Sequence, residues 1–255
     1  MQLMGTAQRQ TEFKRKFEDA ESFIGLDDRF HCGSHFSNPG IVLHYLSRVA
    51  PYIEANVELH GRSLDHPERV FSSLQYSFAN ALSDFTDVRE LTPEFYFLPD
   101  MFLNYNYCNF GRKQDGAVVS NVELPPWADK NAFKFVQVMR EGIESQYVSA
   151  NLHTWIDYIF GCKQRDQEAV NALNTFSKIT YAPEYPGDFD ISLVSDPTLR
   201  SAYESQCYNY GQTPSQLFKT GERHPPKNPP MQALKSNLVV DLVARLKVFK
   251  PVPGG

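Results

Sequence analysis

His153 and Asp157 form the pair with the clearest chemical potential, four residues apart in the stretch SANLHTWIDYIFGCKQR at 149–165. Side chains at this spacing share one face of a helix, so an imidazole and a carboxylate there are candidates for a catalytic or metal site. A zinc site needs three or four ligands, and this pair supplies two. We therefore favour a hydrogen-bonding pair, bonded to each other or across a groove, on the solvated side of a helix.

The apolar residues around that pair predict which side of the helix is buried. They recur at i, i+3, i+4, i+7 and i+8, which makes one stripe at 3.6 residues per turn. Ser149 or Asn151 is suited to cap the start of the helix, and Gly161 is suited to a left-handed end. The stripe that we expect inside the protein comprises Leu152, Trp155, Ile156, Ile159 and Phe160.

His31, Cys32 and His35 are the best candidate for a metal site, because three possible ligands lie close together. No second cluster of histidines and cysteines accompanies them, and a structural zinc site needs a fourth ligand. The alternative is that Gly33 and Ser34 form a turn and that the histidines bond to backbone groups. We favour this second interpretation.

Two further arrangements would suit an enzyme. Ser34 and Ser37 lie near histidines, as in a hydrolase, but the sequence has no nucleophile elbow of the form G-x-S-x-G. Glu90 and Glu94 are four residues apart, but Pro93 between them argues against a shared helical face. We expect these glutamates to accept hydrogen bonds from the adjacent arginine or from backbone in an irregular core.

Composition limits the classes of function. The chain of 255 residues contains 19 Phe, 13 Tyr and 2 Trp, enough aromatic side chains for a large core without cross-links. A net charge of −5 argues against a general nucleic-acid binder. Four scattered cysteines without a CxxC indicate a reducing, intracellular setting, although their number allows two disulfides. We find neither a signal peptide nor a membrane-spanning run.

The elements that must position these residues are mostly helices. Residues 7–23 are helix-prone, and Asn38-Pro39 opens a helix that ends by Pro51. Prolines at 93 and 99 instead predict that 89–106 is buried, extended and irregular. Further helices are expected from Asp65, with Phe71, Leu74, Phe78 and Leu82 inward; over 129–147, with Phe133, Val136, Met139 and Ile143 inward; and over 167–178, with Val170, Leu173 and Phe176 inward.

The remaining segments have weaker patterns. VVSNVELPPW is expected to be a short strand, and 179–200 a loop followed by short helical pieces. ERHPPKNPP at 222–230 is predicted to be a linker rather than a polyproline ligand. The apolar run LVVDLVARLKVF after it fits a helix or a strand equally well. Trp127 and Trp155 are both expected in the core.

Six phrases occur in an order that resembles the BEACH domain, the family of beige, neurobeachin and the factor associated with neutral sphingomyelinase. They are GSHFSNPGIVLHYLSRVAPY, LDHPERVF, DVRELTPEFYFLPDMFLN, LPPWA, YVSANLHTWIDYIFGCKQR and GQTPSQLF. The resemblance covers about 30–225, and more weakly 5–30. It divides the chain into a helical lead-in at 1–30, the domain body at 31–225, and a linker with an apolar tail at 226–255.

The resemblance implies a mainly α fold in which helices surround irregular extended core segments. The residues that it marks as structural are Gly33, Ser34, Ser37, Asn38, Pro39, His66, Pro67, Arg69, Glu90, Pro93, Glu94, Pro125, Pro126, Trp127, Asn151, Trp155, Gly161, Gly211, Gln212 and Pro214. Family members usually begin some seventy residues earlier, after a PH-like domain, and continue into a WD-repeat propeller. The chain is therefore expected to be truncated at its N-terminus.

The resemblance also implies a function without catalysis, cofactor or metal. Members are large cytoplasmic scaffolds, peripherally associated with membranes, that act in vesicle traffic, lysosome-related organelles and receptor sorting. We expect the domain to bind the PH-like domain and trafficking or signalling proteins, and no nucleic acid. The alternative is a metal-dependent or hydrolase-like enzyme that uses the histidine and carboxylate pairs. The expected partner groove comprises His153, Asp157, Tyr158, Lys163, Gln164 and Arg165.

Overall fold

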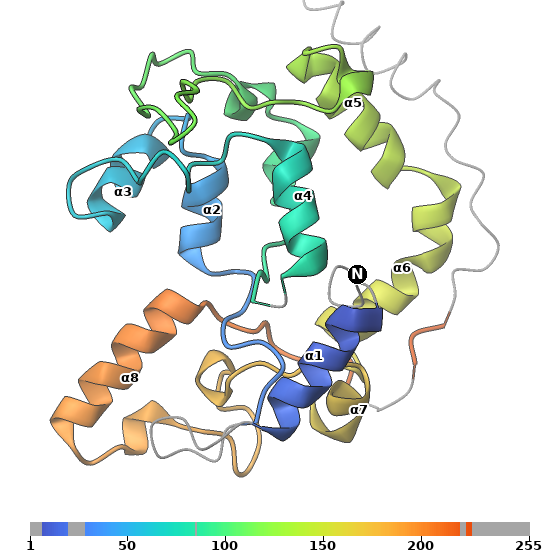
Figure 1. Cartoon of the computed structure of the whole chain (residues 1–255). Helices are drawn as coiled ribbons and strands as arrows, with labels where there is room; N and C mark the ends of the chain where they lie inside the picture. Colours follow the sequence, from blue (N-terminus) through green and yellow to red (C-terminus); the bar gives the residue numbers. More distant parts are fainter. Residues whose placement is uncertain (1–6, 20–28, 85, 220–222, 226–255) are drawn as a thin grey trace, which may run out of the picture.

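The computed structural model describes residues 7–19, 29–84, 86–219 and 223–225, and it is mainly α-helical (Figure 1). The predicted linker therefore lies largely, and the apolar tail wholly, outside the described residues. The α-helices are α1 (Ala7–Glu18), α2 (Pro39–Tyr45), α3 (Tyr52–Leu59), α4 (Leu74–Ser83), α5 (Ala132–Ile143), α6 (Gln146–Ile159), α7 (Asp166–Asn171) and α8 (Pro197–Tyr210). Short 3₁₀ helices are η2 (Pro93–Tyr96), η3 (Pro99–Phe102), η4 (Pro126–Ala128), η5 (Lys178–Thr180) and η6 (Ile191–Leu193).

The helices α5 and α6 follow one another in an arc along one side of the molecule, while α2, α3 and α4 lie together (Figure 1). Extended chain in the described residues pairs only through isolated bridges, such as the one between Ser73 and Glu123. The strand predicted for VVSNVELPPW is therefore wrong, because its backbone bonds to loops rather than to a ladder. For example, the amide of Val122 donates to the carbonyl of Phe102 over 2.8 Å.

The segment 89–106 is irregular and contributes to the main core, as predicted, but it forms two 3₁₀ helices rather than extended chain. Two 3₁₀ helices, each opened by one of its prolines, bury Phe95, Met101 and Phe102 completely. The ring of Phe95 meets that of Tyr45 edge to face, with centroids 4.9 Å apart, and that of Phe102 at 5.6 Å. Such T-shaped contacts add to the free energy gained from burying the rings. The helices α2, α4 and α5 surround this centre.

Polar side chains start the helices, although not always those that the sequence suggested. Asn38 caps α2 as expected, accepting from the amide of Gly40 over 2.7 Å. Ser145 caps α6, so the start predicted at Ser149 or Asn151 is wrong by one turn. Asp65 caps no helix: its carboxylate pairs with Arg69 at 2.7 Å, and Ser73 caps α4 instead.

Several expected inward faces are only partly right, because tertiary contacts rotate the helix. In α5, Val136 is buried and Met139 packs on the core as expected. Phe133 is 64% exposed and Ile143 is also exposed, whereas Phe135 is buried against η3. In α4, Leu74 is buried, but Phe78 and Leu82 are exposed. The expected helix over 167–178 stops at Asn171, so Leu173 and Phe176 reach the core from a loop.

Arg9 connects α1 to the rest of the fold. Its guanidinium is buried and donates to the carbonyls of Ala81, Asp84 and Asp87, at and just beyond the C-terminal end of α4. A cation there compensates carbonyls that the helix leaves unbonded and interacts favourably with the helix dipole. One side chain thereby holds the N-terminal helix against a segment more than seventy residues away.

We expect Arg9→Met to lower the free energy of unfolding by at least about 3 kcal/mol, because it leaves buried carbonyls without their charged donor. Arg15→Met on the same helix is the matched control. Its side chain is 61% exposed and, among the described residues, pairs with the half-exposed Glu12 and the exposed Asp19. The control should change stability by about 0.5 kcal/mol or less. Urea unfolding of both variants measures the difference, and equal midpoints would contradict the role given to Arg9.

Candidate functional site

The helix α6 lies with the opposite orientation to the one that its sequence predicts. Asp157 is only 3% exposed, whereas Trp155 is 43% and Leu152 44% exposed. Trp155 and Asp157 are two residues apart and therefore lie on opposite faces of the helix. The prediction of a buried apolar stripe and a wet polar face is wrong for these residues, because the inward face packs on backbone that needs polar partners.

Asp157 accepts hydrogen bonds from two backbone amides, one just beyond the end of α6 and one from a distant segment. Its Oδ1 accepts from the amide of His224 over 2.7 Å, and its carbonyl accepts from the amide of Lys163 over 3.0 Å. Gly161 packs so closely that a Cβ there would lie 2.9 Å from the Cα of Asp157. The expected left-handed glycine cap is wrong, since Gly161 is required by this close approach and has no positive φ.

Side-chain amides close the end of α6. Gln164 is buried and donates through Nε2 to the carbonyls of Ile159 and Pro214. Asn174 donates through Nδ2 to the carbonyls of Tyr158 and Lys163, both over 2.9 Å. These amides satisfy the carbonyls that a helix end leaves free. Gln164 is thus part of the interior rather than the wall of an open groove.

The six residues expected to form one groove separate into different surroundings. Asp157 and Gln164 are buried, and the ammonium of Lys163 lies over the ring of Tyr158, 4.5 Å from its centroid. Within the described residues, His153 has no hydrogen bond to Asp157; its Nε2 lies 3.4 Å from Thr154 Oγ1 instead. Of the six, Arg165 alone lines a sizeable cavity in the described part of the chain.

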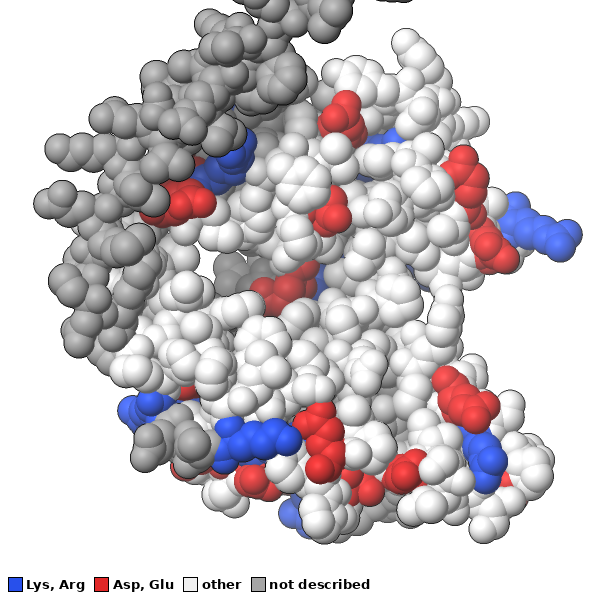
Figure 2. All heavy atoms as spheres, turned by 180° about the vertical axis from the view of Figure 1, so that it is seen from behind, with Lys and Arg blue, Asp and Glu red and all other residues white. Residues whose placement is uncertain are grey.

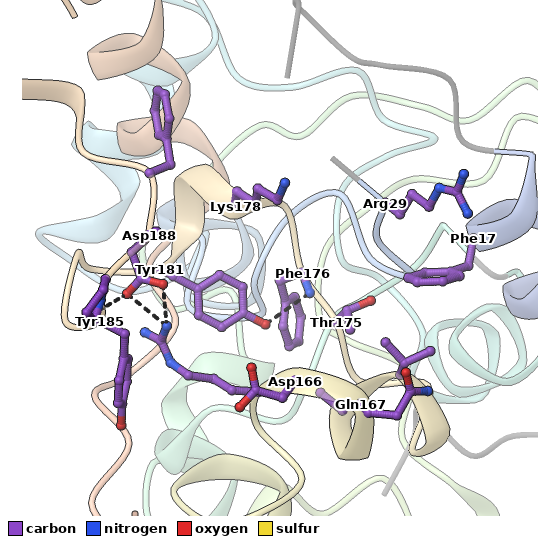
Figure 3. Close-up of a pocket in the computed structure, with 16 residues that line it drawn as sticks. Phe17, Arg29, Asp166, Gln167, Thr175, Phe176, Lys178, Tyr181, Tyr185 and Asp188 are labelled. Carbon is purple, nitrogen blue, oxygen red and sulfur yellow. Dashed lines mark hydrogen bonds and ion pairs between the residues drawn. The ribbon is translucent and has the colours of Figure 1, made fainter. Parts of the chain in front are cut away.

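That cavity has a volume of about 540 Å³ and lies between α1, α7 and the segment 175–189 (Figure 3). Arg165 binds both carboxylate oxygens of Asp188 at 3.0 Å. Its guanidinium also lies over the rings of Tyr181 and Tyr185, 4.9 and 4.7 Å from their centroids. Asp188 further accepts from the amides of Glu184 and Tyr185, and these bonds and Arg165 hold its pKa below the usual range despite partial burial.

The sequence did not indicate this cavity. Its residues Tyr181, Tyr185 and Asp188 come from a stretch predicted only as a loop. The available signal was the density of aromatic residues in YAPEYPGDFD, because large aromatic side chains are usually at least partly buried.

The histidines of the expected turn bond to backbone and hydroxyl groups. His35 Nδ1 accepts from the amide of Ser37 over 3.1 Å, and His31 Nδ1 from the amide of Thr175 over 3.4 Å. Both rings are buried, which lowers the pKa of each to about 4, and the nearby Lys16 adds to this for His31. No group of three or more candidate ligands for a metal occurs in the described part of the chain.

The glutamates do not bond to the adjacent arginine. Arg89 binds Asp87, with Nε 2.9 Å from Oδ1, and its Nη1 lies 2.8 Å from His44 Nε2. Burial raises the pKa of Glu90 above its usual range, although the positive charge of nearby Arg9 opposes this shift. Glu94 keeps a buried Oε2 that has no partner among the described residues. The expected bonds from the arginine are therefore wrong, because Asp87 is the closer acceptor.

Phrases from the two ends of the domain meet in space. Ser37 Oγ donates to the carbonyl of Gln212 over 2.9 Å, and the amide of Gln212 donates back to Ser37 Oγ over 3.0 Å. Gly211 has φ of 76°, and a Cβ there would lie 2.6 Å from the nitrogen of Asn38. These motif residues therefore connect the two ends of the domain to each other.

Other expectations concern the tryptophans, the cysteines and the membrane. Trp127 stacks on Phe135 with centroids 5.4 Å apart, yet both it and Trp155 stay more than 40% exposed, so neither is fully in the core. All four cysteines are free thiols, so the two disulfides that their number allowed do not form. In the described segments, no helix is long and apolar enough to cross a bilayer.

We expect Asp157→Ala to lower the free energy of unfolding by about 1–3 kcal/mol, because the half-buried amide of His224 loses its acceptor and the buried carboxylate leaves a gap. Glu204→Ala is the control, since Glu204 is an exposed carboxylate in the middle of α8. It should change stability by no more than about 0.5 kcal/mol. Thermal and urea melts of the two variants test this. If the Asp157→Ala protein is as stable as the control, Asp157 is a surface residue and its buried role is wrong.

Acid should destabilise the protein through its buried histidines. Between pH 6.5 and 4 the unfolded chain binds protons at positions such as His35 that the folded chain leaves neutral. The stability that depends on these neutral histidines is therefore fully present above pH 6.5. As the pH falls below 6.5, the free energy of unfolding decreases by up to about 1.4 kcal/mol per pH unit for each such histidine. His35→Asn, which keeps an acceptor for the amide of Ser37, should reduce this slope.

The control for the acid effect is His66→Asn, because His66 is exposed. It should leave the dependence of stability on pH as it is in the parent. Urea titrations at pH 7, 6 and 5 measure the slopes. Identical slopes for the parent and for His35→Asn would show that His35 titrates alike in the folded and unfolded states.

Comparison of the sequence with known proteins identifies a family that it matches. The model of the Beige/BEACH domain matches residues 1–227. The chain is 43% identical over 218 residues to BEACH domain-containing protein lvsD of Dictyostelium discoideum, which covers 86% of this chain. It is 44% identical over 217 residues, 84% of the chain, to BEACH domain-containing protein B of Arabidopsis thaliana. Beige protein homolog 1 of Saccharomyces cerevisiae is 42% identical over 221 residues, or 86%.

These relatives are far longer than the chain. The aligned part makes up 7% of the Dictyostelium protein, 8% of the Arabidopsis protein and 10% of the yeast protein. The matched region is therefore one domain within each large relative.

Proposed function

The chain belongs to the Beige/BEACH domain family, and from this premise we propose that it is a non-enzymatic interaction module of a scaffold protein in membrane traffic. Its partners are a PH-like domain of the same parent protein and trafficking or signalling proteins. The parent is cytoplasmic and associates with membranes peripherally. The domain contributes recognition surfaces, and it contributes no catalytic group.

The observation that carries this proposal is the apolar stripe that α6 turns outward. Leu152 and Trp155 of the stripe are 44% and 43% exposed, and Tyr147, nearer the start of the helix, is 71% exposed. Burial of Asp157 on the opposite face fixes the rotation of the helix, so the stripe cannot turn inward without breaking that contact. Large exposed apolar side chains of this kind mark surfaces that bind other proteins.

The residue types on the stripe suit a protein interface. Tryptophan and tyrosine are the side chains that most often dominate binding energy, because they bury much area at a small cost in conformational entropy. Trp155 is held in place by an edge-to-face contact with Phe160, with centroids 6.0 Å apart. A partner would therefore meet a pre-formed anchor rather than a side chain that it has to order.

Charge supports an apolar mode of contact. The chain carries a net charge of −5, and the face shown in Figure 2 has acidic and basic side chains interspersed over the residues that the structure describes. An electrostatic binder of nucleic acid or anionic lipid concentrates basic residues on one face. Recognition through the α6 stripe needs no such concentration.

We assign the PH-like domain to the stripe because, in the relatives, the matched region is a small part of a much longer protein that can supply neighbouring domains. In the relatives the matched region is a tenth of the protein or less, so most of each chain lies outside it. A metal-dependent or hydrolase-like activity has weaker support, since the Nδ1 atoms of His31 and His35 already accept backbone hydrogen bonds. Each of these rings therefore offers a metal one nitrogen at most.

The variant Trp155→Ala tests the proposal. A fully buried tryptophan would cost about 3–5 kcal/mol on truncation, but we expect about 1 kcal/mol or less for this half-exposed ring. Affinity for the isolated PH-like domain of the parent should fall about tenfold or more, as for an anchor residue. Calorimetric titration and a thermal melt on the same sample measure both.

Tyr208→Ala on α8 is the control for this titration, because Tyr208 is 74% exposed and lies away from α6. It should bind the PH-like domain as the parent does. Unchanged affinity of Trp155→Ala would remove the α6 stripe as the docking surface. A large loss of stability instead would mean that Trp155 belongs to the core.

A further inference from the structure

We propose that the apolar run 238–249 of this chain docks on the exposed stripe of α6 and covers, within one molecule, the surface assigned above to the PH-like domain. The inference rests on the proposed function only for its consequence, which is competition between the run and that domain. The run lies outside the described residues and beyond residues 1–227, which the family model matches. It is therefore a segment that the matched domain does not account for.

The chain leaves its described part beside α6. The amide of His224 donates to Asp157 Oδ1 over 2.7 Å, and the ring of His224 meets that of Phe218 with centroids 4.4 Å apart. Asp157 lies in the last turn of α6, and Pro225 is the last described residue. The rest of the chain thus continues from a point that is fixed on this helix.

The connection from that point to the run is long enough to reach the stripe. Twelve residues, 226–237, separate Pro225 from the run, and three of them are prolines. Proline-rich chain is extended by about 3.1 Å per residue, so the connection spans up to about 37 Å. The 14 residues of α6 make a helix about 21 Å long and about 10–12 Å across. The run can therefore pass round α6 from Asp157 to the opposite face, which carries Trp155.

The sequence LVVDLVARLKVF suits an apolar surface whether it forms a helix or a strand. Leu238, Leu242 and Leu246 are spaced by four residues, so they share a face at a period of 3.6 and also at a period of 2. Asp241 and Lys247 lie away from that face in both cases. One side of the run can therefore cover the α6 stripe while the other stays in water.

Charge also favours this contact. Residues 226–255 contain five basic residues and one acidic residue, so they carry +4, and the rest of the chain carries −9, since the whole has a net charge of −5. The helix α6 contains no lysine or arginine, and Glu141 and Glu144 are exposed just before it. Opposite charges draw the run toward the domain, and the tether keeps its effective concentration on the order of millimolar.

The test measures how accessible Trp155 is to acrylamide in the whole chain. Trp127→Phe removes the other tryptophan and keeps a ring to stack on Phe135, so fluorescence in this background reports Trp155 alone. In this background, Leu242→Gln combined with Leu246→Gln should raise the quenching constant about twofold, because the indole loses its apolar cover. The emission of Trp155 should also shift to longer wavelength.

Asp241→Gln combined with Lys247→Gln is the matched control. It also introduces two glutamines into the run, but away from the apolar face, and it leaves the net charge unchanged. Its quenching constant should equal that of the background. Thermal melts of the three proteins check that the fold is kept. The quenching constants should be the same at about 1 and about 50 μM protein, because contact within one molecule does not depend on concentration.

Titration with the PH-like domain measures the consequence. The protein with Leu242→Gln and Leu246→Gln should bind this domain about fivefold more tightly than the parent does, because no competing segment occupies the stripe. If the PH-like domain binds none of the proteins, the proposed function is wrong. The quenching experiment uses no partner, so it still decides whether the run covers Trp155.

Three outcomes would overturn the proposal. The first is equal quenching of Trp155 in the background, the leucine variant and the control. The second is a quenching constant of the background that changes with protein concentration, since the occupant would then come from a second copy. The third is equal quenching together with binding to phosphatidylserine vesicles that the leucine variant loses, which would make the run a membrane anchor.

Discussion

The fold depends on one constraint: buried backbone without regular secondary structure must still have its carbonyls and amides bonded. Polar side chains meet this need from inside the protein. Arg9 serves three carbonyls near the end of α4, Arg48 donates to the carbonyl of Ser120, and Asn56 to that of Leu43. Gln164 and Asn174 do the same around the end of α6. These side chains are as much a part of the core as its rings.

The same constraint explains why α6 faces the way it does. Its inner face packs on irregular chain that offers an amide to Asp157, so a carboxylate is favoured there over an apolar side chain. The apolar stripe is consequently turned outward, where Trp155 and Leu152 remain half exposed. Satisfying backbone in the interior and leaving an apolar surface exposed to solvent are thus two results of one helix rotation.

Contacts between distant segments form the cavity between α1, α7 and the segment 175–189. The turn at 31–40 bonds to residues 209–212, and Phe176 packs with Phe13 of α1 in the smaller core. These contacts hold α1 and the segment 175–189 in place, and the cavity lies between them and α7. The domain therefore carries an exposed apolar helix face and a cavity lined by aromatic side chains on one framework.

The sequence alone determined the family, the mainly α class, the cap at Asn38 and the proline-broken core, because ordered motifs and local backbone limits do not depend on distant contacts. Tertiary structure decided the rotation of α5 and α6 and the end of α7. Periodicity identifies an amphipathic helix, but which face turns inward depends on what packs there. At Asp157 and around the Tyr181 cavity, the neighbours come from segments that no local pattern connects.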